Sequence, residues 1–217
     1  MKYKCLVFDH DDTIVNSTAT VHYPCFQQYL DQFFPGKKLS LSEYFEKNFY
    51  PGFLQMCRND FSMSEQQIKD EEIFWNDYVK NHVPSAYPFI REIMEEHKKQ
   101  GGIIAISSHS FTENIIRDFK INNLPMPDVI YGWDLPEEKR KPNPYSLLDI
   151  MKRYDLSPNE LLMIDDAKAG YEMAKQCNVE FAGVGWSNDI VAIQQFMKQN
   201  SDYYFTSVED FKDFLGY

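Results

Sequence analysis

Short apolar runs alternate with helix-like patterns along most of the chain. The runs are brief, and each is followed by polar or turn-forming residues, as in strands buried within a sheet. Strands that alternate with helices are typical of a parallel α/β sheet, in which ligands bind beyond the carboxyl ends of the strands. We expect strands at residues 3–8, 102–106, 129–131, 161–164 and 181–184.

Residues 16–83 carry a different pattern, rich in aromatic side chains at helical spacing. Apolar residues between Phe26 and Phe34 recur every three or four positions, so they lie on one face of a helix. We expect this segment, which follows the first strand, to form a helical insert whose aromatic residues pack as its own core. Further helices are expected at residues 39–49, 53–57 and 65–80.

Polar side chains directly follow three of the expected strands. Because the carboxyl ends of parallel strands lie at one edge of the sheet, side chains that are distant in the sequence would converge there. The pairs are Asp9 and Asp11 after the first strand, Ser107 and Ser108 after the second, and Asp165 and Asp166 after the fourth.

The composition is that of a folded, acidic protein. Of the 217 residues, 43% are apolar and 25% are charged, which allows a substantial core. The formal net charge is −11, and the densest basic run is residues 139–141 (KRK). Such a surface repels nucleic acids and anionic membranes, so we expect neither as a partner. A phosphorylated substrate still fits if a bound cation and a lysine make the pocket locally positive.

The cysteines and the apolar segments indicate the cellular compartment of the protein. The widely spaced Cys5, Cys25, Cys57 and Cys177 form no C-x-x-C pair, so we expect free thiols rather than disulfides. The first ten residues lack the apolar stretch of a secretory signal, and no apolar run approaches the roughly 20 residues of a membrane span. We therefore expect a soluble cytoplasmic protein.

Four motifs, in this order, resemble those of the haloacid dehalogenase (HAD) superfamily. Residues 9–17 (DHDDTIVNS) resemble its signature D-x-D-G-T-[LIV]-x-[DN]-S, the most specific of the four. Residues 103–107 (IIAIS) resemble the second motif, a strand that ends in a hydroxyl residue, and residues 141–144 (KPNP) resemble K-P-x-P. Residues 162–170 (LMIDDAKAG) resemble the fourth motif, in which an acidic residue precedes Gly or Asp by four positions.

The resemblance implies a doubly wound, Rossmann-like α/β core with the first strand in the middle of its sheet. A helical cap of the C1 type would be inserted after that strand. The core would comprise residues 1–15 and 84–217, and the cap residues 16–83. Such caps open and close over the site, with hinges expected near residues 15–18 and 82–85.

The same resemblance implies a Mg²⁺-dependent phosphohydrolase, similar to phosphoglycolate phosphatase and β-phosphoglucomutase. Asp9 would attack phosphorus and form a transient aspartyl phosphate, and Asp11 would act as general acid and then as general base. To act as an acid and a base, Asp11 needs a pKa near neutrality, and burial and neighbouring carboxylates would raise it in that direction. The substrate would be a small phosphorylated metabolite such as phosphoglycolate or a sugar phosphate.

Three further motif residues would hold the phosphoryl group. The resemblance implies that Ser107, Ser108 and Lys141 bind its oxygens, and that Lys141 also neutralises Asp9. The ordinary alternatives are a structural serine at the end of a strand and a solvated lysine within a short basic run.

The implied metal site consists of carboxylates and one backbone oxygen. Mg²⁺ would be bound by Asp9, Asp166 and the carbonyl of Asp11, with Asp165 at the ion directly or behind it. Asp12 departs from the family pattern because glycine is usual at its position. If that position requires a positive φ, Asp is among the few other residues that tolerate it.

Other interpretations of these residues stay open. An Asp-rich turn can simply cap a helix, and we expect His10 to be structural and His109 to lie at most near the pocket rim. A phosphomutase would share the whole catalytic set. A non-catalytic binding protein, or an interaction module that uses the aromatic residues of the insert, would belong to another class. A receiver domain is excluded because the Lys-Pro pair precedes the last acidic pair.

Overall fold

The computed structural model describes residues 2–217 and contains one six-stranded parallel sheet with the order β3-β2-β1-β4-β5-β6. The first strand is central, which confirms the doubly wound α/β fold. The five expected strands are present, and a sixth, short and partly exposed, was not expected from the sequence. The strands are β1 (Cys5–Phe8), β2 (Ile103–Ser107), β3 (Val129–Tyr131), β4 (Leu161–Asp165), β5 (Glu180–Val184) and β6 (Tyr203–Phe205).

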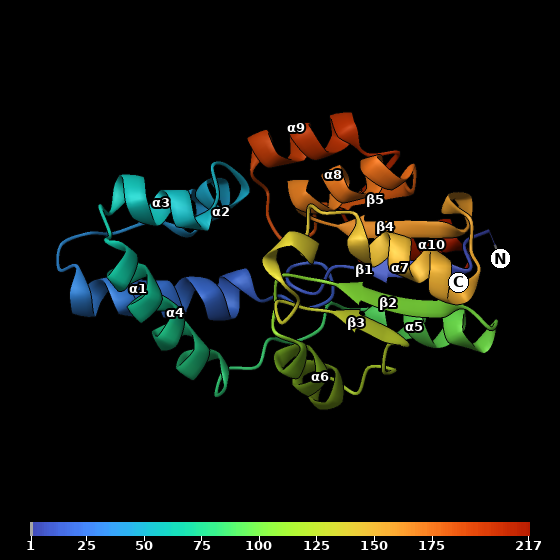
Figure 1. Ribbon diagram of the computed structural model, residues 1–217, viewed down its shortest axis with the longest axis horizontal. Coiled ribbons are helices and arrows are strands. Elements are labelled where there is room, and N and C mark those ends of the chain that lie inside the picture. The colour runs from blue at the N-terminus through green and yellow to red at the C-terminus, as the bar shows by residue number, and fades with distance from the viewer. Residues whose placement is uncertain (1) are drawn as a thin grey trace.

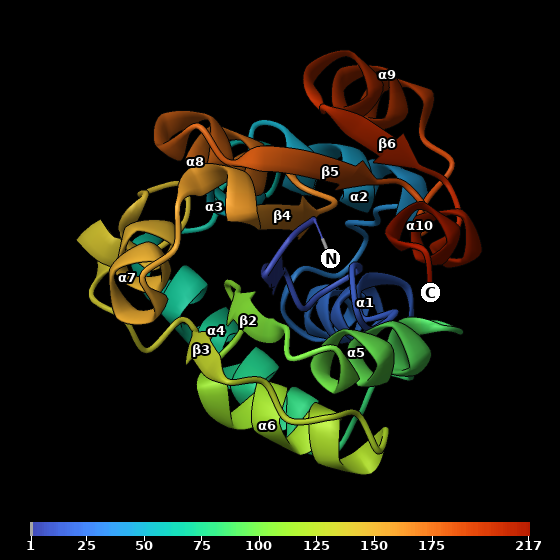
Figure 2. The same cartoon turned by 90° about the vertical axis from the view of Figure 1, so that its right-hand side faces the viewer.

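Helices cover both faces of the sheet, as the continuous apolar character of its strands requires. Because side chains alternate along a strand, Leu6 and Phe8 on β1 face one helical layer, whereas Cys5 and Val7 face the other. Figure 2 shows these layers from the end of the molecule where the two termini lie. One layer holds α5 (Ile90–Lys99), α6 (Thr112–Ile121) and α10 (Val208–Leu215); the other holds α7 (Tyr145–Tyr154), α8 (Lys168–Cys177) and α9 (Val191–Asn200).

A helical segment follows β1 and lies beyond the carboxyl ends of the strands (Figure 1). Its own apolar core includes the buried Phe26 and Tyr29, as expected, whereas Phe33 is 49% exposed. Ser40 and Ser64 begin two of its helices with capping boxes. The segment consists of the π-helical turn η1 (Thr18–His22), α1 (Tyr23–Phe33), α2 (Leu41–Phe49), α3 (Phe53–Asp60) and α4 (Glu65–Val79).

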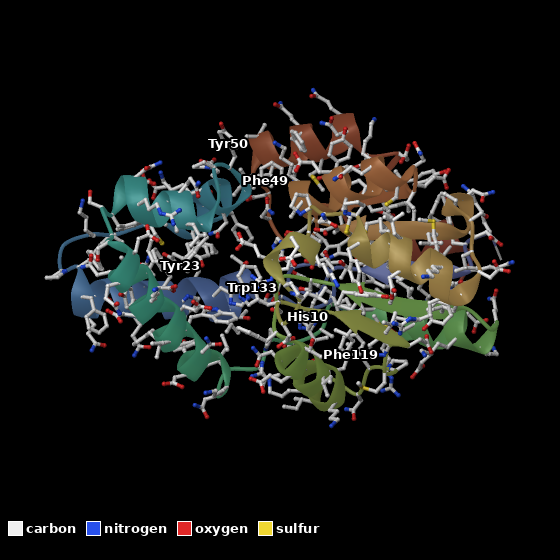
Figure 3. All side chains as sticks on the ribbon, in the orientation of Figure 1. His10, Tyr23, Phe49, Tyr50, Phe119 and Trp133 are labelled. Carbon is white, nitrogen blue, oxygen red and sulfur yellow. The ribbon has the colours of Figure 1, made fainter. Side chains whose placement is uncertain are left out.

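Two chain crossings join this segment to the sheet, and they run side by side. Val15 and Ala86 form an antiparallel bridge, and the Asn16 N–H donates to the Ser85 carbonyl at 3.0 Å. A separate apolar contact joins α2 to α9, where the rings of Phe49 and Phe196 meet edge to face at 5.4 Å. Figure 3 shows Phe49 where these two helices approach each other.

Two further expectations concern the whole chain. All four cysteines are buried and free, in agreement with the prediction from their spacing. Within residues 2–217, no helix is both long and apolar enough to cross a membrane.

Candidate active site

The turn after β1 carries the first acidic residues. Asp9 continues the strand pairing, because its N–H donates to the Ile164 carbonyl at 2.8 Å, and only 5% of the residue is exposed. The chain then folds back on itself through Asp12, which has a φ of 58°. The position usually held by glycine thus has a left-handed backbone, a conformation that Asp is among the few other residues to tolerate. The Asp12 carboxylate also accepts from the Thr18 N–H at 3.1 Å and so anchors the start of the helical segment.

Lys141 lies at the centre of the acidic cluster. Its ammonium group donates to Asp9 at 2.8 Å and to Asp165 at 2.7 Å, and all three side chains are buried. Burial alone would lower the pKa of this lysine, but attraction by Asp165 and Asp9 outweighs that effect and raises it. The lysine is therefore a fixed cation beside the carboxylate that the sequence motif predicts to be the nucleophile.

Asp165 is held in a tightly packed environment. One of its carboxylate oxygens binds Lys141, and the other accepts from the Ala167 N–H at 2.8 Å. A Cβ added at Gly170 would lie 2.1 Å from the Asp165 carboxylate, so α8 approaches the cluster only because this position is glycine. The glycine of the fourth motif thus has a packing reason.

Three carboxylates form a group that suits a hard cation. Oxygens of Asp9, Asp165 and Asp166 lie within 4.8 Å of one another. Burial, reinforced by neighbouring carboxylates, raises the pKa of Asp166 well above its ordinary value. Burial also raises the pKa of Asp165 to about 7 and that of Asp12 to about 6. Asp9, Asp12, Asp165 and Asp166 gather around a single lysine. A Mg²⁺ ion with oxygen ligands would suit both their negative charge and their oxygen atoms.

The two serines at the end of β2 take different positions. Ser107 is the last residue of the strand, and its hydroxyl lies 2.9 Å from that of Ser146, under α7 and α8. The expected contact of Ser107 with a phosphoryl group is therefore not supported, because strand alternation turns this side chain into the core. Ser108 lies just beyond the strand and does line the cavity around Asp9.

Asp11 is oriented by residues that the sequence did not single out. One of its oxygens lies 3.0 Å from His22 Nε2, and the other accepts from the Ser110 hydroxyl. Burial would raise the pKa of Asp11, but the hydrogen bonds from His22 and Ser110 outweigh burial and lower it. The expectation of a pKa raised toward neutrality is therefore wrong for this arrangement.

The tautomer of His22 follows from its other neighbour. The Trp75 indole N–H donates to His22 Nδ1 at 3.0 Å, and an indole nitrogen can only donate. Nδ1 is therefore the acceptor, and the Nε2–H group donates a hydrogen bond to the Asp11 carboxylate. The negative charge of Asp11 raises the pKa of His22 against the opposing effect of burial, but a second ring proton would break the bond to Trp75. No motif marked either residue, since their contact depends on how η1 and α4 fold.

Two further histidines, His10 and His109, lie near the turn after β1 and the lysine loop. His10 lies 3.1 Å from Asp118 and stacks on Phe119 of α6 (Figure 3). His109 lies 2.9 Å from the Lys141 carbonyl and lines the cavity, so it connects the loop after β2 to the lysine loop.

One cavity brings most of the expected site residues together. It opens at the carboxyl ends of β1, β2 and β4, where the order of the strands reverses and α/β proteins commonly bind ligands. Of the seven expected site residues, only Ser107 and Asp165 are absent from its lining, and Asp165 touches the lining residue Lys141. The residues that line the cavity are Asp9, Asp11, Asp12, Ser108, His109, Lys141, Asp166, Ala167 and Ala169.

The fold, the acidic cluster and its buried lysine define a class of hydrolase. The chain belongs to the haloacid dehalogenase-like hydrolase family, whose model matches residues 6–184.

Individual relatives are distant in sequence. A phosphoglycolate phosphatase from Vibrio vulnificus is 24% identical over 193 residues, a match that covers 83% of either chain. Another from Pseudomonas putida is 26% identical over 129 residues, which is 58% of this chain but only 45% of that relative.

Solved structures show the same fold over nearly the whole chain. A protein described as a haloacid dehalogenase-like hydrolase from Bacteroides fragilis has a TM-score of 0.81 at 20% identity, covering 97% of this chain and all 100% of that one. A predicted phosphoglycolate phosphatase from Haemophilus somnus has a TM-score of 0.76 at 20% identity, covering 99% of both chains.

Proposed function

We propose that this protein is a Mg²⁺-dependent phosphatase that hydrolyses a small phosphorylated metabolite through an aspartyl phosphate. The observation that carries the proposal is the position of Asp9 between Lys141 and Asp166, at the cavity where the strand order reverses. Phosphoryl transfer requires little more of a protein than positioning and charge stabilisation, and this cluster offers both.

Asp9 is the proposed nucleophile. One of its carboxylate oxygens forms a bond to phosphorus while the bond from phosphorus to the leaving oxygen breaks. Water then attacks the aspartyl phosphate, which releases inorganic phosphate and restores Asp9. The hydrogen bond from Lys141 fixes the position of this carboxylate at the cavity.

Asp11 is the proposed general acid and base. It would give its proton to the leaving oxygen and would later take one from the attacking water. The low pKa imposed by His22 and Ser110 keeps Asp11 ionised in this arrangement. A phosphate dianion placed beside it would raise that pKa by repulsion, so the acid step becomes possible once substrate is bound.

Other residues would hold the charges in place. Lys141 would neutralise the phosphoryl oxygens, and Asp165 would fix the position of Lys141. Ser108, rather than Ser107, is the serine placed to donate to a phosphoryl oxygen. Asp9 and Asp166 would hold Mg²⁺ together with the carbonyl of Asp11, with Asp165 next to the ion. When bound, the ion would reduce the repulsion between these acids and the incoming phosphate.

Residues 16–83 are the proposed cap, with the paired linkers at Val15 and Ala86 as its hinge. Support comes from the position of the helical segment over the carboxyl ends of the strands and from the contact of its His22 with Asp11. Closure of the cap would exclude water from the acidic cavity. The names of the curated relatives support a small phosphorylated metabolite as substrate.

The test is phosphate release from p-nitrophenyl phosphate and a panel of metabolite phosphates, with and without Mg²⁺. Wild-type protein should release phosphate only with the ion, and Asp9→Asn should lower kcat by about a thousandfold or more. Asp31→Asn, at an exposed position of α1, serves as the matched control and should keep wild-type activity. Retention of turnover by Asp9→Asn, or its absence from wild type on every compound, would reject the proposal.

A further inference from the structure

His109 lies at the mouth of the acidic cavity, on the loop after β2. The residue is exposed, whereas Ser108 and Ser110 on either side of it are buried. It lines the same cavity as Asp9 and Lys141. The cavity volume is about 160 Å³, so a phosphoryl group has room beside the imidazole ring.

One nitrogen of the His109 ring is already committed. Nε2 lies 2.9 Å from the Lys141 carbonyl, and a carbonyl oxygen can only accept, so Nε2 carries a proton and donates it in this bond. In the neutral ring, Nδ1 then has a lone pair and no proton. Within residues 2–217, Nδ1 has no hydrogen-bond partner, so it is the ring nitrogen that a ligand can use.

The ring is held in one orientation by its neighbours. Trp133 meets it edge to face, with ring centroids 5.7 Å apart and an angle of 83° between the planes. The guanidinium carbon of Arg140 lies 3.9 Å from the centroid of the Trp133 ring, and its Nε donates to the Leu135 carbonyl at 2.7 Å. Together with the Nε2 bond, these contacts fix the imidazole, so a ligand that binds Nδ1 would immobilise little that is free to move.

The cavity has little positive charge for a phosphate ester. Of the described residues that line it, Lys141 alone carries a fixed positive charge, and its ammonium group already donates to Asp9 and Asp165. Even with Mg²⁺ bound, a second side-chain cation would offset part of the repulsion between the acids and a phosphate dianion. The carboxylates that line the cavity are those of Asp9, Asp11, Asp12 and Asp166.

The protonation of His109 depends on the charges around it. Desolvation and the positive charge of Lys141 lower the pKa of the ring, against the negative charges of Asp9 and Asp11, which raise it. Arg140, on the neighbouring indole, is the other charged group packed against this part of the loop. The lowering prevails, so the ring without a ligand is neutral near neutral pH, and a phosphate dianion beside it would raise its pKa again.

We propose that His109 is a second phosphoryl-binding cation: a proton from the solvent adds to Nδ1 as the phosphate binds, and Nδ1–H then donates to a phosphoryl oxygen. The inference rests on the proposed phosphatase function and adds a residue to its phosphoryl site. Because Nε2 keeps its bond to the Lys141 carbonyl in either protonation state, the ring gains its charge without turning. A histidine that only held the lysine loop would use Nε2 alone, and this difference makes the two roles separable.

Tungstate, a tetrahedral dianion that stays ionised at neutral pH, tests the protonation step in the wild-type chain with Mg²⁺. Nitrogen NMR spectra distinguish protonated from unprotonated imidazole nitrogens, and the signals lost in His109→Asn identify those of His109. At about pH 7, His109 should show one protonated nitrogen without tungstate and two with saturating tungstate. An unprotonated Nδ1 in the presence of tungstate, or spectra that do not respond to tungstate, would overturn the inference.

Two substitutions separate phosphoryl binding from a structural role, with p-nitrophenyl phosphate as substrate. The terminal amide of His109→Gln can replace Nε2 at the Lys141 carbonyl but leaves nothing at the position of Nδ1. KM should rise by about tenfold or more, because a charge-assisted hydrogen bond to the phosphoryl group is lost. His109→Asn places an amide N–H at the position of Nδ1 and loses the bond to Lys141, and it should raise KM less.

The order of the two variants decides between the roles. A wild-type KM in His109→Gln with a raised KM in His109→Asn would show that the residue only holds the lysine loop. Glu113→Gln, an exposed change in the first turn of α6, is the control and should keep the wild-type KM. Wild-type turnover in the same assay keeps the proposed phosphatase standing whatever the variants do. Absence of that turnover would reject the proposed function and this inference with it.

Discussion

At the scale of single residues, the candidate site depends on groups that act on one another. Lys141 touches two carboxylates, so neither Asp9 nor Asp165 has an isolated environment. Asp11 is shaped in the same way by His22 and Ser110. Side chains that belong to one network do not contribute independently, and substitutions among them will not be additive.

Gly170 tests the packing behind the lysine. Gly170→Ala places a methyl group 2.1 Å from the Asp165 carboxylate, so Asp165 must move away from Lys141. We expect kcat to fall by about tenfold to a hundredfold and the free energy of unfolding to fall by about 1–3 kcal/mol. Steady-state kinetics and urea denaturation measure the two effects.

A matched control for this change lies on the same helix. Glu172→Ala removes a half-exposed side chain whose recorded partner is Lys168 and should leave both quantities close to wild type. Wild-type activity in Gly170→Ala would show that the position of Asp165 is not held by this contact.

At the scale of elements, the helical segment carries a buried acid that should make its stability depend on pH. Glu71 on α4 is 4% exposed, and burial raises its pKa to about 7. In the folded protein this carboxyl binds its proton more tightly than in the unfolded chain. Its contribution to stability is therefore greatest below about pH 4.5 and is lost as pH rises through about 7.

Glu71→Gln removes this titration. From pH 5 to pH 8, thermal or urea unfolding of the wild type should lose about 3 kcal/mol more than unfolding of Glu71→Gln. Glu72→Gln, at the exposed neighbouring position, should retain the wild-type slope. Parallel curves for Glu71→Gln and the wild type would contradict the assignment of the slope to Glu71.

A second prediction at this scale concerns the contact between α2 and α9. Phe49→Ala removes the edge-to-face contact with Phe196 and should weaken the docking of the helical segment on the sheet layer by about 1–2 kcal/mol. Amide hydrogen exchange in α2 should accelerate by about tenfold. Tyr50→Ala changes a neighbouring aromatic that is 74% exposed and should have little effect. Equal exchange in the two variants would show that this contact does not hold α2.

At the scale of the whole molecule, the acidic character is concentrated where a cation fits. The net charge is −11, and three carboxylates meet at the ends of β1 and β4. Mg²⁺ at about 100 times its Kd should stabilise the folded protein by about 2.7 kcal/mol. For a chain of this length, Tm should then rise by about 5–10 °C.

Calorimetry with and without EDTA measures this shift. Asp166→Asn should abolish most of it, because a ligand is lost, whereas Asp31→Asn on α1 should preserve it. A wild-type Tm that does not respond to Mg²⁺ would contradict the proposed binding of Mg²⁺ by Asp9 and Asp166.

Much of the fold follows from local patterns. The apolar runs predicted five of the six strands, and the spacing of aromatic residues predicted the helices of residues 16–83 to within a few residues at their ends. β6 escaped because its three residues, Tyr203–Phe205, are only partly buried and show no continuous apolar run. The sequence flagged Asp12 because glycine is usual at its position, and the structure supplies the reason, a left-handed backbone that Asp tolerates.

By itself, the sequence determined the alternation of strands and helices, the order of the motifs, and the convergence of Asp9, Asp11 and Asp166, because residues that follow parallel strands meet at one edge of the sheet. The doubly wound core and the place of Lys141 followed from the resemblance that the motifs carry. Only the tertiary structure decided that Ser107 turns into the core, and that His22 and Ser110 hold Asp11. Those contacts join elements far apart in the chain: Ser107 meets α7, Ser110 reaches Asp11 from the loop after β2, and His22 reaches it from the helical segment. Patterns of neighbouring residues carry no record of that packing.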